Sequence, residues 1–344
     1  DHIYPIDLYD HCIFRGREFR IYLFSILTTL NDIKKIGIRI FGLVVLLVLS
    51  NLIYKRTFFE SDIQKHSEII ELVRDVQDHA KIIYLGESSN ITTRADDMDK
   101  RSISEFVADH YPDLEFGHIT KPASHAGIYR VLLENIPTDS PIETVIVTLN
   151  LRSFNAQWIY SDLETALQKS TILLEHNPPL LNRYKLAFKG YDIKNNRERL
   201  NQVLKKWKQD ELLFDFETPY KNVIEWDKAV YHNGIKNPNG SKNQELTVLA
   251  CHYIKAYAFP VDTLVNPRIK DFNDIVELAK ERNWNLVFNL MAENLEKADE
   301  LLGKDITQIM EFNSQFLVNY FGNKGVTVVD NFDNIGNEQF IDQD

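Results

Sequence analysis

An apolar run near the beginning of the chain constrains the fold more than any other feature of the sequence. Residues 36–54 read IGIRIFGLVVLLVLSNLIY and contain a single charged side chain, Arg39. A helix of this length, at about 1.5 Å per residue, extends about 28 Å, which is close to the hydrocarbon thickness of a bilayer. The run therefore predicts a transmembrane helix. A buried core helix of a soluble protein is the alternative, whereas a cleaved signal peptide is disfavoured because a long segment precedes the run and no small-residue cleavage site follows it.

The charges beside this run predict its orientation. On its amino-terminal side lie Arg15, Arg17, Arg20, Lys34, Lys35 and Arg39, while Lys55 and Arg56 follow it immediately. The positive-inside rule then places residues 1–35 in the cytoplasm, and the chain beyond Lys55 outside the inner or plasma membrane, as in a periplasm. Within residues 55–80, apolar side chains recur at helical spacing, which predicts a stalk helix leading into the main domain.

The acidic composition and the two cysteines exclude some classes of protein. The formal net charge is −11, which argues against nucleic-acid binding because phosphate neutralisation requires clustered Lys and Arg. Cys12 and Cys251 are expected on opposite sides of the membrane, so the fold of the domain cannot depend on an internal disulfide. No Cys/His spacing resembles a zinc site, and we expect neither a metal nor a cofactor.

Beyond the stalk, apolar β-branched runs alternate with helical patterns. Strands are expected at residues 81–85, 114–120, 144–151, 285–291 and 326–329, and helices at 96–111, 123–136, 269–282 and 305–320. This alternation predicts an α/β domain over residues 81–344, with a parallel sheet flanked by helices in three layers, as in flavodoxin-like folds. A mainly helical, aromatic-rich stretch at about residues 154–260 interrupts it and predicts a cap inserted into the same sheet.

The first expected strand ends in Gly86-Glu87-Ser88-Ser89-Asn90. Ligands and catalytic residues collect at the carboxyl ends of parallel strands, and a glycine there allows a tight turn and a close approach of substrate. Ser88 is therefore a candidate nucleophile. The alternative is that Ser88 or Ser89 only caps the following helix, since such turns are rich in Gly, Ser and Asn.

Two further residues fit an acyl-transfer site, which requires a nucleophile, a base and fixed donors for an oxyanion. Asn150 ends the third expected strand, so its amide should lie on the same sheet edge as Ser88 and could donate to an oxyanion. The alternative for Asn150 is a turn or cap residue. Gly127 could offer its backbone N–H beside Ser88, or it could be a glycine that allows close packing.

Other polar residues are weaker candidates. Glu293 and Asn294 follow a strand and are expected to line the pocket on the same edge. Arg152 is expected to pair with Glu87, with the alternative that it holds an anionic group of the substrate. The histidines inside the domain could supply a base in space, although hydrogen-bonded structural roles are the expected ones for at least two of them, His118 and His125. The complete set is His118, His125, His232 and His252.

The blocks at Gly86–Asn90, Gly127 and Asn150, followed by an Asp-rich end after the last strand, resemble in position and order the SGNH (GDSL-type) hydrolase superfamily. A single amino-terminal span before an extracytoplasmic domain is similar to the D-alanyl-lipoteichoic acid and alginate O-acetylation proteins. The resemblance implies Ser88 as nucleophile, and the N–H groups of Ser88 and Gly127 with the Asn150 amide as oxyanion donors. It also implies a terminal Asp-x-x-His block, whose aspartate is Asp342 or Asp344.

The chain departs from the family pattern at three places. Glu87 replaces the usual aspartate, Asn150 lacks the preceding glycine and following aspartate, and no histidine follows Asp344. The chain begins with Asp1 rather than methionine, so we expect it to be part of a longer product that continues into the catalytic histidine. The alternative is a degenerate, non-catalytic member of the family.

The resemblance implies a membrane-anchored extracytoplasmic esterase or O-acyltransferase. It would act on a cell-envelope glycan or acylated polymer through an acyl-Ser88 intermediate, and a multi-span membrane O-acyltransferase could supply its acyl groups. The main alternative is a non-catalytic envelope subunit that keeps the fold for binding or assembly. A soluble cytosolic α/β enzyme with residues 36–54 buried is a third possibility.

Overall fold

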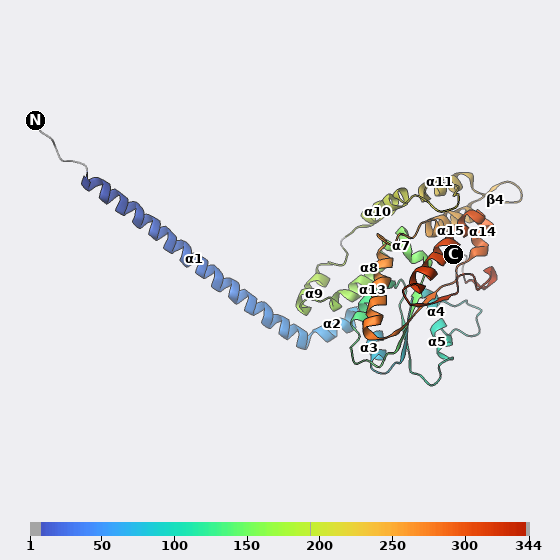
Figure 1. The fold of residues 1–344 in the computed structure, drawn as a ribbon, viewed down its shortest axis with the longest axis horizontal. Helices are drawn as coiled ribbons and strands as arrows, with labels where there is room; N and C mark the ends of the chain where they lie inside the picture. Colours follow the sequence, from blue (N-terminus) through green and yellow to red (C-terminus); the bar gives the residue numbers. More distant parts are fainter. Residues whose placement is uncertain (1–7, 193, 342–344) are drawn as a thin grey trace, which may run out of the picture. The chain divides into compact units, whose positions relative to one another are not determined.

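The computed structural model describes residues 8–192 and 194–341. They divide into two compact units (Figure 1). Of the described residues, the first contains Leu8–Glu60 together with Pro178–Leu180, and the second contains Ser61–Asn177 and those from Leu181 to Ile341. The second unit thus begins well before residue 81, where the sequence suggested that the domain starts.

The first unit is built on one long helix, α1 (Leu8–Thr57), drawn in blue in Figure 1. Its segment Asp32–Thr57 is long and apolar enough to cross a membrane. Large apolar side chains on this segment are exposed, as at Phe41, because the unit has no core of its own in which to bury them. By length and composition, the segment suits a membrane span or a signal sequence. The helix is longer at both ends than the predicted span at residues 36–54.

The expected stalk is not one helix. Two short helices follow α1, namely α2 (Phe59–His66) and α3 (Glu68–Gln77). In α3, Ile69, Ile70 and Val73 are buried. A Cβ on Gly117 of the neighbouring strand β2 would lie 2.8 Å from Cβ of Val76. The apolar stripe in this region therefore belongs to the core of the second unit, and the stalk prediction was wrong for α3.

The second unit contains a five-stranded sheet in which every strand is parallel to its neighbours, as the sequence predicted. The strands are β1 (Ile82–Gly86), β2 (Phe116–Thr120), β3 (Thr144–Leu149), β6 (Asn285–Leu290) and β7 (Thr327–Asp330). Their order is β2-β1-β3-β6-β7. The connections run toward β2 on one side of β1 and toward β3 on the other, so the topological switch point lies between β1 and β3. Open α/β sheets commonly bind ligands at such a point.

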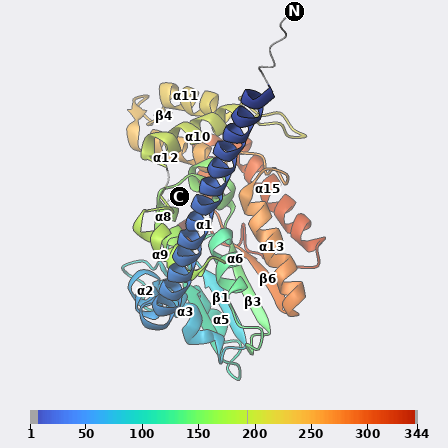
Figure 2. The same ribbon diagram turned by 90° about the vertical axis from the view of Figure 1, so that its left-hand side faces the viewer.

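Helices flank the sheet. On one side lie α6 (Ala126–Glu134), α13 (Pro267–Arg282) and α15 (Lys304–Gly322), and Figure 2 shows α6 and α13 beside β3 and β6. Phe288 of β6 projects into this layer, where its ring centroid lies 5.0 Å from that of Phe272 and 4.9 Å from that of Phe321. All three rings are at most 1% exposed. This aromatic cluster joins α13 and α15 to the sheet.

Two helical expectations need correction. The helix expected at residues 96–111 is only α5 (Ile103–Ala108), because Ser102 and Glu105 form a reciprocal capping box that fixes its first turn at Ile103. A helix that the sequence did not suggest, α14 (Leu295–Leu302), follows β6 and begins at an N-cap asparagine, Asn294. The expected helix at residues 305–320 corresponds to α15.

The stretch at 154–260 is mainly helical, as expected. It contains α7 (Ala156–Ile159), α8 (Leu163–Thr171), the 3-10 turn η2 (Ile172–Leu174), α9 (Pro179–Ala187), α10 (Asn196–Gln209), α11 (Val223–Asn233) and α12 (Gln244–Tyr257). It also contains a short antiparallel pair that was not expected, β4 (Ile235–Lys236) and β5 (Lys242–Asn243). The last helix, α12, is largely buried, so this end of the insertion is part of the core.

Candidate functional site

Ser88 is exposed and lies just beyond the carboxyl end of β1. Glu87 has an extended backbone and occupies the N-cap of the short helix α4 (Ser88–Ile91), in which Ser88 is the first residue. Ser88 is therefore not the N-cap residue, which was the alternative to a role as nucleophile. Within the described residues, no side-chain base makes a hydrogen bond to its hydroxyl.

Asn90 fixes the turn that carries Ser88. Its Nδ2 donates to Ser104 Oγ at 2.9 Å and to Thr120 Oγ1 at 2.6 Å, and its Oδ1 accepts from the N–H of Ser104 at 2.8 Å. A Cβ on Gly86 would lie 2.9 Å from Cβ of Asn90, so only glycine fits where the chain folds back. Because Asn90 is 3% exposed, these bonds hold the turn rigidly to α5 and β2.

Ser88 and Arg152 line two pockets. The smaller one, about 40 Å³, is also lined by Glu87, Ser124, His125, Asn150 and Trp158. The larger one, about 280 Å³, is also lined by Ser89, Met291, Glu293, Gln339, Phe340 and Ile341. The predicted nucleophile and the predicted oxyanion donor thus share a cavity. Of the two residues expected to line a pocket on this edge, Glu293 does so and Asn294 lines neither pocket.

Asn150 follows β3 and acts in two ways. Its Oδ1 accepts from the N–H of Arg152 at 2.9 Å and so caps the 3-10 turn η1 (Leu151–Phe154). Its Nδ2 donates to Glu87 Oε1 at 2.5 Å. A primary amide has two N–H donors, so one remains available for a ligand. The capping role and a donor role are therefore compatible in this residue.

Burial raises the pKa of the Glu87 carboxyl, while the bond from Asn150, the charge of Arg152 and the bond from Ser89 lower it. Burial is the larger effect, so the protonated form is favoured more than in water. Arg152 was expected to pair with Glu87, but the ion pair that it forms is with Glu293, whose Oε2 lies 4.0 Å from Nε. The charge of Arg152 still acts on Glu87.

Tyr257 of α12 also holds Glu293, at the same carboxylate oxygen as Arg152. The Tyr257 hydroxyl donates to Glu293 Oε2 at 2.5 Å, and Glu293 is 4% exposed. Burial, followed by the charge of Glu293, raises the pKa of Tyr257 well above its ordinary value. The helical insertion, through Tyr257, thereby holds a carboxylate of the larger pocket in place. Periodicity in the sequence could not reveal this contact.

The expected role of Gly127 as an oxyanion donor is not supported by its geometry. Its N–H donates to His125 Nδ1 at 3.1 Å in the cap of α6, and Gly127 lines neither pocket. A Cβ on Gly127 would lie 2.8 Å from Asp271 Oδ2. We therefore assign Gly127 to close packing of α6 against α13, which was its simpler interpretation.

His125 lines the smaller pocket, but its hydrogen bonds disfavour a role as general base. Nδ1 receives the N–H of Gly127 and lies 2.7 Å from Nη1 of Arg268. Because both neighbours are donors, Nδ1 is the acceptor and the proton of the neutral ring lies on Nε2. His125 is thus a donor through Nε2. The other three candidate histidines, His118, His232 and His252, line neither pocket.

Ser124 and the strained residue before it, Ala123, were not predicted from the sequence. Ser124 is 6% exposed and lines the smaller pocket, and its Oγ makes no hydrogen bond to any described residue. Ala123, in the same pocket, has a φ of 63°, a conformation that costs a residue with a side chain about 1 kcal/mol or more. Buried unsatisfied hydroxyls and backbone strain both collect at functional sites.

The segment after β7 reaches the same site. Arg94 Nη1 donates to the carbonyl of Glu338 at 3.1 Å, and Asn294 Nδ2 donates to Asn337 Oδ1 at 2.9 Å. These bonds hold the 3-10 turn η3 (Asn337–Gln339), after which Phe340 and Ile341 line the larger pocket with Ser88. Asp342 and Asp344, the candidate aspartates of the terminal block, lie outside the described residues.

Polar side chains connect β1 to β6 across β3, and β3 to β1. Tyr84 of β1 accepts from Asn289 Nδ2 of β6 at 3.0 Å, and Asn289 Oδ1 accepts from Asn331 Nδ2 at 2.7 Å. Thr148 Oγ1 of β3 donates to the carbonyl of Leu85 at 3.0 Å. Among the described residues, no group of three or more His, Cys, Asp or Glu side chains is arranged to hold a metal ion.

No protein-family model matches the chain, and no curated protein matches its sequence. The functional argument therefore rests on the position of Ser88, Asn150 and Arg152 at one edge of the sheet and on the two pockets that they line.

Proposed function

We propose that this chain is a membrane-anchored, SGNH-like esterase or O-acyltransferase that acts on a cell-envelope glycan or polymer through an acyl-Ser88 intermediate. One observation carries the proposal: an exposed serine at the end of β1 shares a cavity with the amide of Asn150 at the end of β3. The order of the strands supports the resemblance to that superfamily, since its flavodoxin-like sheet has the same arrangement.

In this proposal, Ser88 Oγ attacks the carbonyl carbon of an acyl ester and its proton passes to a base. The carbonyl oxygen becomes an oxyanion, which the free N–H of the Asn150 amide stabilises. The C–O bond to the leaving alcohol then breaks, and the alcohol takes the proton. Water or an acceptor hydroxyl releases the acyl group by the reverse steps. Ser124 Oγ and His125 Nε2 are further donors from the smaller pocket.

The base is the part of the mechanism that the resemblance assigns to the terminal Asp-x-x-His block. The residues immediately before Asp342 line the larger pocket with Ser88, which supports assigning that block to the same site. Arg152 lines both pockets, and we propose that it orients a polar group of the substrate while it balances the carboxylates of Glu87 and Glu293.

A serine-directed fluorophosphonate tests the proposal directly. The full-length protein in detergent is expected to form a covalent adduct, and mass spectrometry should find it on the tryptic peptide between Lys81 and Arg94, at Ser88 rather than Ser89. Heat-denatured protein is the control, because an activated serine loses its reactivity when the site unfolds. An adduct spread over several serines, or none, contradicts the proposed nucleophile.

We also propose that α1 anchors the protein, with residues 1–35 in the cytoplasm and the second unit in the periplasm. The protein is expected to stay with membranes in alkaline carbonate, because about twenty apolar residues in lipid resist extraction. Protease added to spheroplasts should digest the second unit. Release by carbonate, or protection from external protease, contradicts this topology. A multi-span O-acyltransferase is the proposed acyl-supplying partner.

A non-catalytic envelope subunit is the second candidate. It is favoured by the absence, among the described residues, of a base bonded to Ser88, and by the bond that engages part of the Asn150 amide. This candidate predicts binding of the polymer without any adduct on Ser88.

A further inference from the structure

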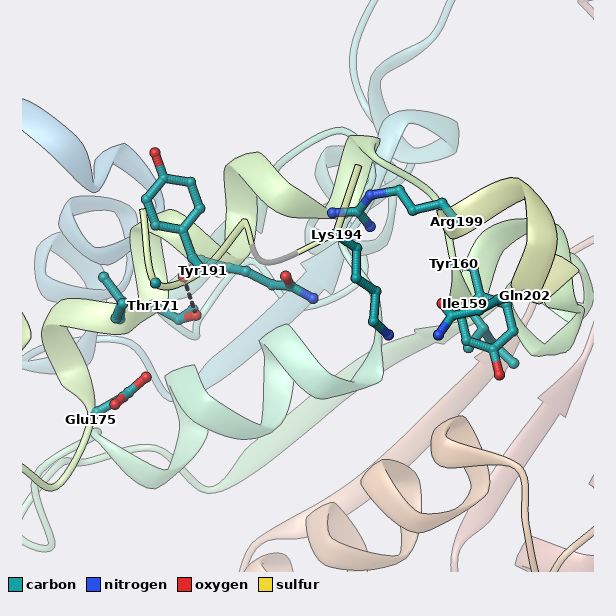
Figure 3. Close-up of a pocket in the computed structure, with 11 residues that line it drawn as sticks. Ile159, Tyr160, Thr171, Glu175, Tyr191, Lys194, Arg199 and Gln202 are labelled. Atoms are coloured by element: carbon teal, nitrogen blue, oxygen red, sulfur yellow. Dashed lines mark hydrogen bonds between the residues drawn. The ribbon is translucent and has the colours of Figure 1, made fainter. Parts of the chain in front are cut away.

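A separate pocket of about 370 Å³ lies within the helical insertion (Figure 3). Its volume falls in the usual range of small-molecule sites, about 300–1,000 Å³. Residues from α7, α8, η2 and α10 line it, and so does the connection between α9 and α10. In Figure 3, Lys194 lies between Tyr191 and Glu175 on one side and Tyr160 and Gln202 on the other.

Gln202 indicates that the pocket takes a ligand with hydroxyl groups. Its Oε1 is buried and accepts no hydrogen bond from the described residues. A buried acceptor without a donor costs about 1–3 kcal/mol, so a hydroxyl that donates to this oxygen would recover that energy. The amide of Gln168 also lines the pocket and is exposed. Side-chain amides both donate and accept, which suits the hydroxyls of a sugar.

Lys194 adds a positive charge. Its Nζ lies 5.8 Å from the ring centroid of Tyr160, and no described carboxylate lies within ion-pair distance of it. By contrast, Arg199 pairs with Asp192 at 3.4 Å and donates to the carbonyl of Ser161 at 3.0 Å, and Glu175 pairs with Lys185. Of the two cationic side chains that line the pocket, Lys194 is therefore the one that can pair with an anionic group of a ligand.

Two tyrosine rings complete the lining. Tyr160 and Tyr191 present apolar faces with a polar hydroxyl at the tip, and such amphipathic rings suit the C–H faces and hydroxyl edges of a sugar. Taken together, the side chains offer ring faces, amides that bond hydroxyls, and one available ammonium group. A small inorganic anion would use only the last of these.

We propose that this pocket binds an anionic saccharide, with its carboxylate or phosphate at Lys194 and its hydroxyls at Gln202. Only one step of this inference rests on the proposed function, namely the assignment of the saccharide to the same polymer on which Ser88 acts. That assignment follows from α7: Trp158 lines the smaller pocket with Ser88, and Ile159 and Tyr160 line the pocket in the insertion. A polymer that crosses α7 would reach both.

Binding to the full-length protein in detergent, measured by isothermal titration calorimetry, tests the inference. The probes are an oligouronate, glucose 1-phosphate, an uncharged glucan of the same length as the oligouronate, and inorganic phosphate. We expect at least one anionic saccharide to bind, and Lys194→Gln to weaken it about tenfold or more, the effect of losing one charge-assisted hydrogen bond. The two anionic saccharides show whether a carboxylate or a phosphate is preferred.

Matched variants control the measurement. Lys205→Gln removes the same charge from an exposed position on α10 that does not line the pocket, and should leave binding unchanged. Gln202→Leu keeps the size of the side chain, removes the buried acceptor and should weaken binding of the saccharide. Inorganic phosphate that binds as tightly as the anionic saccharides, or equal effects of Lys194→Gln and Lys205→Gln, overturns the inference.

Ser88→Ala separates the failure of the inference from that of the proposed function. Binding in the insertion should be the same in Ser88→Ala and in the wild type, because Ser88 lines other pockets. Saccharide binding without any fluorophosphonate adduct would contradict the acyl-serine mechanism and still support the saccharide site. An adduct on Ser88 without saccharide binding would contradict the saccharide site and support the acyl-serine mechanism.

Discussion

Ser88→Ala is expected to lower the hydrolysis of an activated acetyl ester by the full-length protein about a thousandfold or more. Removing the nucleophile of a serine hydrolase abolishes the covalent route and leaves only the catalysis that comes from binding and the oxyanion donors. The fold should be unaffected, because Ser88 is exposed and Asn90, not Ser88, holds the turn to α5 and β2. Release of p-nitrophenol from p-nitrophenyl acetate gives the rate.

Ser89→Ala is the matched control for this experiment. Ser89 is the next residue and carries the same hydroxyl, but that hydroxyl donates to Glu87 Oε1 at 3.3 Å and is not expected to react. Its loss should change the rate only a few-fold. Equal losses in the two variants would mean that the turn, rather than one hydroxyl, matters, and an unchanged rate in Ser88→Ala would leave the binding subunit as the better description.

Phe288→Ala is expected to lower the free energy of unfolding of the second unit by about 3–5 kcal/mol, the usual cost of deleting a buried aromatic ring. The ring is fully buried between Phe272 of α13 and Phe321 of α15. Its removal therefore leaves a cavity that these two helices cannot easily close. Urea unfolding followed by tryptophan fluorescence measures the loss. All four tryptophans, Trp158, Trp207, Trp226 and Trp284, lie in this unit.

The control is the same substitution at an exposed position. Phe188→Ala removes a ring that is 83% exposed, so the change should stay within about 0.5 kcal/mol. A loss below about 1 kcal/mol in Phe288→Ala would show that α13 and α15 are not held to the sheet by this aromatic cluster.

The sheet could be predicted from the sequence because its strands are short, buried and β-branched, and because helical patterns separate them. Each strand of the five-stranded sheet matches its expected range to within two residues at either end. The helices were harder to bound. The start of α5 depends on a capping box at Ser102, and α3 follows the same periodicity whether it projects into solvent or packs against β2. Periodicity identifies an apolar face but not the surface that covers it.

The residues of the candidate site could likewise be predicted only in part. Ser88 and Asn150 were found because the end of a parallel strand fixes where a residue lies. Ser124 and Tyr257 were missed because their positions depend on contacts between segments far apart in the sequence. Of the two roles open for Gly127, the structure supports close packing, because its N–H is used by the cap at His125. A short pattern cannot reveal whether a donor is already engaged. The strained backbone at Ala123 leaves no signature in its residue type.

Three successive strands deliver the groups that line the two pockets: Ser88 follows β1, Asn150 and Arg152 follow β3, and Glu293 follows β6. Since adjacent strands are about 4.8 Å apart, these groups span about 10 Å, roughly the reach of an ester substituent plus the ring that carries it. In the proposed mechanism, substitutions on the β6 side would change how the leaving alcohol fits and would leave the hydroxyl of Ser88 in place. Under that proposal, the selectivity for the alcohol and the attack on the acyl carbon depend on different strands of the same sheet edge.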